Sequence, residues 1–241
     1  MTGWKFLIRS KAGRIVSDYD GSPWVIGEWR EHEGMLEECL GFNCSPTIPQ
    51  ALRFVQGTVV AEVEYEGDVV ESQMKMTARR MRLLRVWEWG KEDSVRLAID
   101  AAESVIRLNE SSYPNDKRPR AAIEAAKRWL EEPSNENRQA AIEAAADAAA
   151  WALYAAASGA VDAARAAARA AYAAASGAAD AADAAARAAY AADAAAEATY
   201  AAYAGARAAA YSAEAASKAS YVAIHTKAAE RLGKPIEEIH A

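Results

Sequence analysis

Alanine dominates the second half of this chain and restricts what that half can form. Of the 77 residues from Ala140 to Ala216, 48 are alanine. Alanine has the highest helix propensity of any residue. Asp, Glu or Arg interrupts the tract every few residues, which excludes a helix that spans a lipid bilayer. We therefore expect this half to form water-soluble α-helices.

The large aromatic residues divide the chain into two parts. Every phenylalanine and six of the seven tryptophans lie before position 130, and 241 residues are enough for two separate cores. We predict an α+β protein, with a small mixed α/β domain over residues 1–90 and an all-α, alanine-rich domain over residues 91–241. The helices of the second domain are expected to form a bundle or a stack of hairpins.

Composition excludes several classes of function. The chain has 28 basic and 34 acidic side chains, a net charge of −6 and no basic stripe, so we expect no direct nucleic-acid partner. Cys39 and Cys44 lack the second pair of ligands that a structural zinc site needs, and the three histidines form no ligand pattern. We predict buried or half-buried thiols, no metal and no cofactor. Because the sequence shows no secretory leader, we also predict a cytoplasmic protein without a membrane partner.

The first sixty residues show short runs of β-branched and aromatic residues that end at Gly, Asp or Pro. These runs predict strands at residues 4–10, 14–20 and 22–29. Residues 47–57 instead show helical spacing, with Thr47 as a favourable N-cap. One short helix should therefore accompany the strands.

Two longer strands should follow. Residues 58–72 alternate between apolar side chains and glutamates, which predicts a half-buried strand. We expect this strand to pair with residues 74–89. The alternation in the second strand slips by one residue near Arg79, which indicates a bulge.

Residues 27–72 carry a Cys, a Gly-aromatic step, a short helix with Ala and a Val-Glu-Val strand, and "RLLRVWEW" follows them. This run resembles a domain of unknown function that recurs in bacterial and phage proteins. Members of that family often have a His after the Gly-aromatic step, where this chain has Asn43. Chemistry that depends on that His is therefore absent here.

The order of strand, helix and strand also resembles the arrangement of ADP-ribosyltransferase folds around their nicotinamide pocket. That resemblance implies that Arg9 holds a phosphate or ribose and that Ser45 braces the site. It further implies that Glu62 or Glu64 polarises the transferred sugar. In the alternative interpretation, the two glutamates form the solvated face of a half-buried strand, because alternation alone produces such a face.

A charged segment at residues 109–130 separates a helix predicted at residues 93–108 from the alanine tract. Asp116 can cap the next helix, and Pro119 falls in its first turn. The arginines of this segment lie beside acids such as Glu110, so we predict a latch in which forked hydrogen bonds tie the two helices together. A polar binding site is the alternative. The latch residues are Tyr113, Asp116, Arg118, Arg120 and Glu124.

The alanine tract repeats with an 18-residue step, which corresponds to five helical turns. A single helix over residues 135–231 would be about 145 Å long and would offer few large apolar side chains to a partner. Glycine is favoured just past a helix end, so the Ser-Gly steps at Ser158 and Ser176 favour hairpins. The repeat is marked by Tyr154, Tyr172 and Tyr190.

Each repeat combines alanine-covered faces with one narrow polar stripe. Such helices should be inner or sandwiched members of a bundle, packed at short axial distances. Tyrosines supply nearly all of the aromatic side chains in the tract. They either fill gaps between alanine faces or form a surface that binds another protein. The partner-binding candidates are Tyr172, Tyr190, Tyr200, Tyr203, Arg165, Arg169 and Arg187.

The segment "YPNDKRPRAAIEAAKRWL" resembles the entry motif of a family of alanine-rich helical immunity proteins, and the likeness covers residues 93–231. It implies a protein that binds and neutralises a partner toxin. We therefore predict a non-enzymatic, inhibitory protein of phage or mobile-element origin that blocks a toxin or a bacterial defence factor, with no catalytic residues. The alternatives are an ADP-ribosyltransferase-like enzyme and a structural virion component. Self-association into a homo-oligomer is left open.

Overall fold

The computed structural model describes residues 1–72, 74–152, 158–175, 222–233 and 235–236, together with eight positions between 181 and 194. It divides into two compact units, Met1–Gly90 with Ala229–Ala241, and Lys91–Ala228. The α+β prediction is confirmed, because strands fill the first unit and helices the second. The elements are β1 (Thr2–Arg9), β2 (Ile15–Val16), β3 (Arg30–Glu31), β4 (Phe42–Cys44), α1 (Ile48–Leu52), β5 (Val59–Glu71), β6 (Met76–Glu88), α2 (Lys91–Ser112), α3 (Arg118–Glu131), α4 (Asn135–Ala152) and α5 (Ser158–Ala175).

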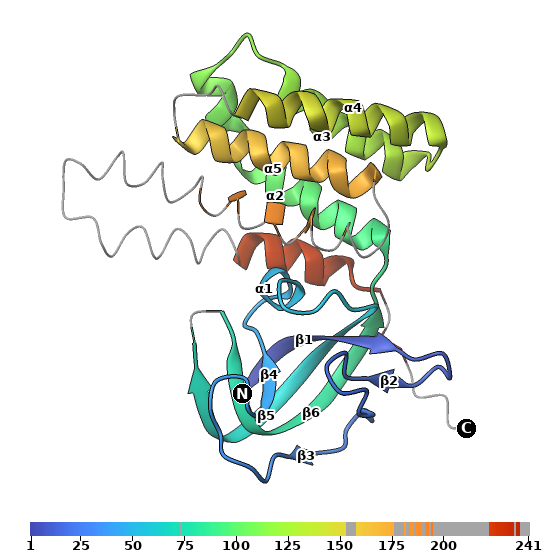
Figure 1. The fold of residues 1–241 in the computed structure, drawn as a ribbon, viewed down its shortest axis with the longest axis vertical. Coiled ribbons are helices and arrows are strands. Elements are labelled where there is room, and N and C mark those ends of the chain that lie inside the picture. The colour runs from blue at the N-terminus through green and yellow to red at the C-terminus, as the bar shows by residue number, and fades with distance from the viewer. Residues whose placement is uncertain are drawn as a thin grey trace, which may run out of the picture. The chain divides into compact units, whose positions relative to one another are not determined.

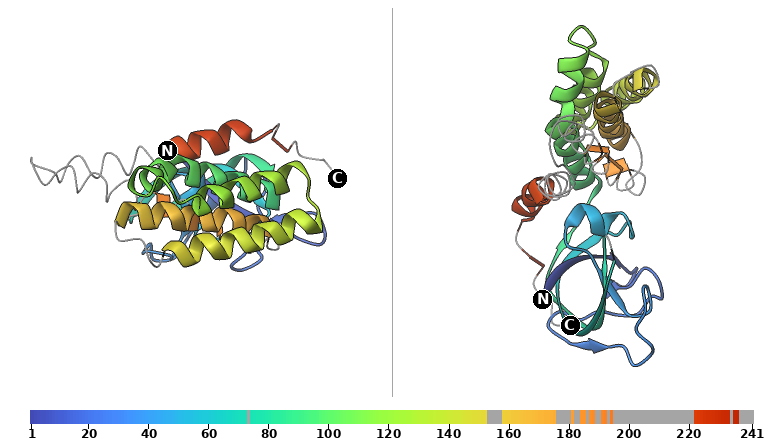
Figure 2. Two further views of the ribbon diagram at one scale, coloured as in Figure 1. Left: turned by 90° about the horizontal axis from the view of Figure 1, so that it is seen from above. Right: turned by 90° about the vertical axis from the view of Figure 1, so that its left-hand side faces the viewer.

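The first unit is a curled, antiparallel sheet, which Figure 1 shows from the side and Figure 2 shows edge-on. Its strands follow the order β2-β1-β5-β6-β3, and β4 pairs separately with β6. All named strand pairs are antiparallel. The curl gives the sheet an inner face on which the apolar side chains of the long strands meet.

The alternation predicted for β5 is confirmed. Val59, Ala61, Val63 and Tyr65 are buried in one core cluster, whereas the glutamates between them are only partly buried. The register of β5 against β6 shifts between Glu66 and Val69, opposite Arg79. A bulge therefore lies where the slip in the pattern predicted one.

The strand predicted at residues 22–29 is wrong. This segment contributes only isolated bridges, from Pro23 to Val16 and from Ile26 to Leu83. Gly27 has φ +84, which interrupts an extended run, and its N–H donates to Leu83 O at 2.9 Å. The short strand β3 begins only after this turn.

The helix α1 begins as predicted, but it ends at Leu52 and not at Gly57. Its N-cap is Thr47, whose hydroxyl accepts a hydrogen bond from Gln50 N, and a proline occupies the first turn. Four of its five residues are buried, so the helix is held by packing rather than by its length.

The last described residues pair with β6. Ile236 N donates to Val86 O at 2.7 Å, and Trp87 Nε1 donates to Gly233 O at 2.9 Å. Ile236 also packs against the core of the sheet. The first unit therefore includes the chain end from Ala229 onward, where the sequence predicted a boundary at residue 90 alone.

The second unit is a bundle of α2, α3, α4 and α5. Helix α5 packs against each of the other three, and α4 and α5 run side by side in Figure 2. Helix α5 begins at Ser158, the first predicted corner, and ends at Ala175, directly before the second. The chain is therefore not one continuous rod through position 158.

Helix α2 is longer than the predicted range of residues 93–108, because it begins at Lys91 and ends at Ser112. Glu92 and Asp93 lie in its first turn, where negative charge is favourable to a helix N-terminus. None of the helices in the described parts of the chain is both long and apolar enough to cross a membrane.

Candidate functional site

A stripe of three large side chains runs along the exposed side of α5. Arg165 and Arg169 are exposed, and Tyr172 retains 48% of its surface. The spacing of four and then three residues places them on one helix face. Asp162 begins the same face, and its Oδ1 lies 3.2 Å from Arg165 Nη1. We call Arg165, Arg169 and Tyr172 the α5 stripe.

The remaining faces of α5 are covered. Its alanines pack against neighbouring helices and most of them have no exposed surface, because a methyl side chain lets helix axes approach closely. The alanines without exposed surface are Ala163, Ala164, Ala166, Ala167, Ala170, Ala171, Ala173 and Ala174. The stripe is thus displayed on a helix that the other three hold in place.

The chemistry of the stripe suits protein recognition. A guanidinium group can donate two parallel hydrogen bonds to a carboxylate, and tyrosine offers a rigid, amphipathic contact surface. No carboxylate in the described part of the chain pairs with Arg169. Its donors therefore face solvent.

Of the other four predicted partner-binding residues, the structure describes Arg187 alone. Arg187 is exposed. Tyr190, Tyr200 and Tyr203 lie outside the described residues. The structure therefore brings together three of the seven predicted residues on one surface.

Of the five predicted latch residues, Arg120 links α3 to α2 through its side chain, and Glu124 pairs with Lys127 on its own helix. Arg120 Nε of α3 donates to Glu110 Oε1 of α2 at 2.8 Å, and this hydrogen bond lowers the pKa of Glu110. A second link joins Lys127 Nζ to Glu103 Oε1 at 2.6 Å and to Glu124 Oε1 at 3.0 Å. Two bridges of this kind hold the helices in register.

Arg118 and Asp116 bind each other within the turn before α3. Asp116 Oδ1 accepts from Arg118 N at 2.9 Å, and the hydrogen bond from the Arg118 side chain lowers the pKa of Asp116. The N-cap position of α3 is Lys117, one residue after the predicted cap. Tyr113 shapes the same turn through its backbone, since Tyr113 O accepts from Asp116 N at 3.1 Å.

The glutamates of the ADP-ribosyltransferase alternative pair across the sheet. Glu62 Oε2 accepts from Arg85 Nε at 2.8 Å, and Glu64 Oε2 accepts from Arg82 Nε at 2.7 Å. These residues are direct neighbours in the β5–β6 register. Such pairs are typical of the solvated face of a sheet.

The structure separates Arg9 from these glutamates. Glu64 lies opposite Thr2 at the start of β1, seven residues from Arg9, which corresponds to roughly 23 Å along the strand. Arg9 Nε instead donates to Glu88 Oε1 at 2.8 Å. Ser45 is buried and exchanges backbone hydrogen bonds with Trp4.

The two cysteines differ in environment. Cys44 is buried, as predicted, and burial raises the pKa of its thiol to about 12. Cys39 is exposed, so the prediction of a buried or half-buried thiol is wrong for it. Cys39 lies in a tight surface turn with φ 72, and its Sγ lies 2.7 Å from Lys75 Nζ.

Sequence reasoning did not single out Lys5 and Arg30, which the structure brings together around Trp24. A signal for Lys5 exists in the sequence, because Lys5 shares its strand face with Leu7 and so falls on the core side of β1. No comparable signal exists for Arg30, which follows an irregular segment.

Comparison of the chain with protein-family models, with curated proteins and with solved structures finds no match. The resemblances to the phage and bacterial domain, to ADP-ribosyltransferases and to immunity proteins therefore stay predictions.

Proposed function

We propose that this protein binds another protein through the α5 stripe. The observation that carries the proposal is the display of Arg165, Arg169 and Tyr172 on an otherwise alanine-covered helix. Arginine and tyrosine are enriched among residues that dominate binding energy at protein interfaces. The two guanidinium groups favour a partner whose contact surface is acidic.

We further propose that binding inhibits the partner protein. The resemblance of residues 93–231 to immunity proteins supports a protein that blocks a toxin or a bacterial defence factor in the cytoplasm. The proposal includes a phage or mobile-element origin and requires no catalytic residues. The pairing of Glu62 and Glu64 with arginines gives no support to the alternative of an ADP-ribosyltransferase.

The experiment is capture from bacterial lysate with immobilised full-length chain. We expect one protein to be retained in stoichiometric amount by the unmodified chain and lost when Arg165→Glu and Arg169→Glu are combined. Tyr172→Ala should weaken retention about tenfold or more, since interface hot spots contribute at least that much. Circular dichroism must show unchanged helix content in each variant.

Matched controls come from exposed positions on other helices. Arg128→Glu on α3 reverses a charge away from the stripe, and Ile142→Ala on α4 removes an exposed apolar side chain. Both controls should retain the partner. Equal loss of retention in the stripe variants and the controls, or full retention in all of them, contradicts the proposal. Inhibition is then tested by whether the chain restores growth when the captured protein is expressed as a toxin.

A further inference from the structure

Two cations lie on the inner side of the curled sheet, in the unit that the proposed function does not use. Lys5 is opposite Ala61, and its neighbour on the same strand face, Leu7, is opposite Val59. Leu7, Val59 and Ala61 belong to one buried core cluster. Because alternate residues of a strand share a face, Lys5 points toward the core side of β1.

Arg30 reaches the same place from the start of β3. Its guanidinium carbon lies 4.5 Å from the centre of the Trp24 ring, and Lys5 Nζ lies 5.5 Å from that centre. The guanidinium carbon is also 5.1 Å from the ring centre of Phe42. Trp24 itself is only 4% exposed. Two positive charges therefore share one buried aromatic ring.

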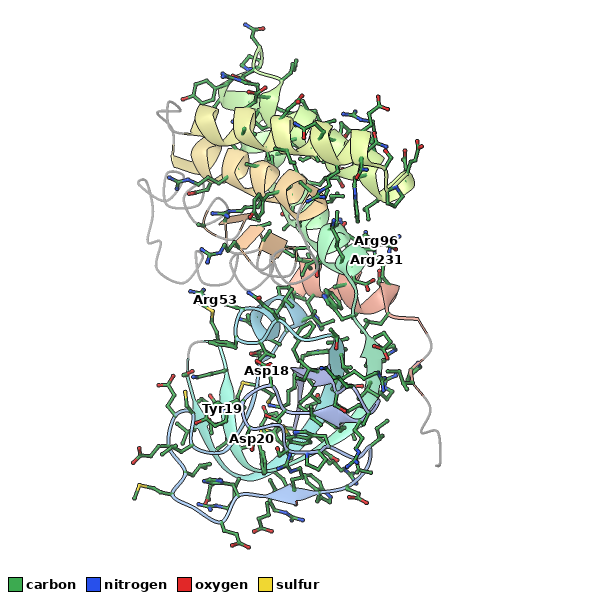
Figure 3. The ribbon with its side chains drawn as sticks, turned by 45° about the vertical axis from the view of Figure 1, so that its right-hand side comes forward. Asp18, Tyr19, Asp20, Arg53, Arg96 and Arg231 are labelled. Carbon is green, nitrogen blue, oxygen red and sulfur yellow. The ribbon has the colours of Figure 1, made fainter. Side chains whose placement is uncertain are left out.

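The local charge is not balanced. No carboxylate in the described residues lies within ion-pair distance of Lys5 or Arg30. The carboxylate that acts on both cations is that of Asp20, on the loop after β2, which Figure 3 labels together with its neighbours. Its Oδ1 accepts from Ser22 N at 3.0 Å, and it acts on both cations only through space. The buried Cys44 thiol stays neutral near pH 7, since burial raises its pKa to about 12.

Hydrogen-bond donors around this ring are also in excess. Lys5 Nζ donates to Asn43 O at 2.9 Å, and Arg30 Nη1 donates to Ser22 Oγ at 3.0 Å. An ammonium group has three donors and a guanidinium group has five, so most of these donors have no hydrogen-bond acceptor among the described residues. Trp24 Nε1 is buried and has no hydrogen-bond partner among the residues that the structure describes. A buried donor without a partner is costly, unless a ligand satisfies it.

We propose that Lys5, Arg30 and Trp24 form a binding site for a small oxyanion, such as the phosphate or carboxylate group of a small molecule. Both residues keep part of their surface exposed, whereas the Trp24 ring is buried. An oxyanion there supplies acceptors to the guanidinium fork and the ammonium group, and it offsets the excess positive charge. This site is independent of the α5 stripe and of its partner.

The experiment measures binding of inorganic phosphate and, separately, of acetate to the full-length chain. Thermal unfolding is followed over rising anion concentration at constant ionic strength, which removes the general effect of salt. We expect the unfolding midpoint to rise with at least one of the two anions. Phosphate alone indicates a phosphorylated ligand, acetate alone indicates a carboxylate ligand, and both results support the site.

Variants locate the effect. Lys5→Met and Arg30→Gln should each weaken the anion about tenfold or more, because each removes a charge-assisted hydrogen bond. Arg85→Gln removes an exposed arginine that pairs with Glu62 on the sheet, and it should leave the affinity within about twofold. An anion effect of equal size in all four proteins overturns the proposal.

A second measurement keeps the test valid if either variant fails to fold. The measurement is NMR of the unmodified chain. The indole N–H signal of Trp24 is assigned by its loss in Trp24→Phe. The side-chain N–H signal of Arg30 is assigned by its loss in Arg30→Gln or, if that variant does not fold, by through-bond correlation to the backbone of Arg30. Saturable shifts of these signals on addition of anion support the site. Absence of both shifts and of any change in the unfolding midpoint overturns it.

Discussion

Lys91 Nζ lies 3.9 Å from the ring centre of Trp129 and donates a hydrogen bond of 2.8 Å to Ala174 O. The next carbonyl, Ala175 O, accepts from Arg138 Nε at 2.7 Å. The last carbonyls of a helix have no partner within the helix, and positive charge is favourable beside them. Residues from the first turns of α2 and α4 therefore bind the last described carbonyls of α5. These hydrogen bonds link the alanine helix to its neighbours in addition to the methyl contacts.

Lys91→Met should destabilise the helical unit. The change keeps most of the side-chain volume but removes the hydrogen bond to Ala174 O and the cation over Trp129, at a cost of about 1–2 kcal/mol. Urea unfolding followed by circular dichroism measures the difference. The control Arg128→Met, at an exposed position of α3, should change the free energy of unfolding by less than about 0.5 kcal/mol. Equal effects of the two changes would argue against the role of Lys91.

Ala167→Leu should overpack the bundle. Ala167 has no exposed surface on α5, so a larger side chain must displace a neighbouring helix at a cost of about 1–3 kcal/mol. The same substitution at the exposed Ala146 of α4 should be nearly neutral, within about 0.5 kcal/mol. Urea unfolding measures the free energy of unfolding of both variants. A higher melting temperature for Ala167→Leu would contradict the close packing of α5.

Lys5→Met should change how stability depends on pH. Burial lowers the pKa of Lys5 from 10.5 to about 8, so between these values the unfolded chain binds a proton that the folded chain does not. The free energy of unfolding contributed by Lys5 therefore rises with pH across this window, and the cost of burying the charge is complete below pH 8. The stability of the variant relative to the unmodified chain should therefore be greatest below pH 8 and should fall as the pH rises toward 10.5.

The comparison of the two proteins isolates Lys5 from its neighbours. Cys44 acts in the opposite direction, because its raised pKa lowers stability between pH 9 and about 12. The other charged groups that act on Lys5 are Arg30, whose pKa burial lowers, and Asp20, whose pKa the hydrogen bonds from Ser22 lower. Both groups are present in the two chains, so their own titration enters both sides of the comparison. Thermal unfolding of Lys5→Met and of the unmodified chain at the same series of pH values gives the difference in their stability. A constant difference across the window would show that the Lys5 ammonium group is not buried.

Arg120→Gln should make the latch less sensitive to acid. The hydrogen bond from Arg120 lowers the pKa of Glu110, so its stabilising contribution is present above the ordinary pKa of glutamate and is lost as the pH falls through the lowered value. At pH 7 the variant should lose no more than about 1 kcal/mol of unfolding free energy, because the side chains of Arg120 and Glu110 are both partly exposed and their pairing is weakened by solvent. The loss should vanish near pH 2. Urea unfolding at the two pH values measures this, and an equal loss at both would contradict the ion pair.

The chain should release no nicotinamide from NAD. Arg9 is separated from Glu64 along β1, and Glu64 is paired with Arg82. Nicotinamide release is measured by chromatography with the unmodified chain and with Glu64→Gln. If the unmodified chain released nicotinamide and Glu64→Gln did not, Glu64 would have a catalytic role beyond its ion pair with Arg82. The same variant should change stability by less than about 1 kcal/mol, since the pair is partly exposed.

Local patterns in the sequence determined much of the secondary structure. The alternation in β5 set its buried face, and Thr47 with the following proline set the start of α1. The Ser-Gly step at Ser158 marked the start of α5, although the sequence alone also allowed one long helix. These features succeed because capping, turn formation and face alternation depend on residues that are near each other in the chain.

Tertiary structure alone decided which distant residues meet. Ile236 joins Val86 through a backbone hydrogen bond, and backbone groups carry no residue-specific signal. Arg30 reaches the Trp24 ring from β3, which pairs with β6, whereas Lys5 reaches the same ring from β1, which pairs with β5. The sequence could predict that Lys5 faces the core side of β1, but it could not predict that Lys5 meets the Trp24 ring. Sequence spacing determines the face on which a side chain lies, whereas the closure of the sheet determines what that face encloses.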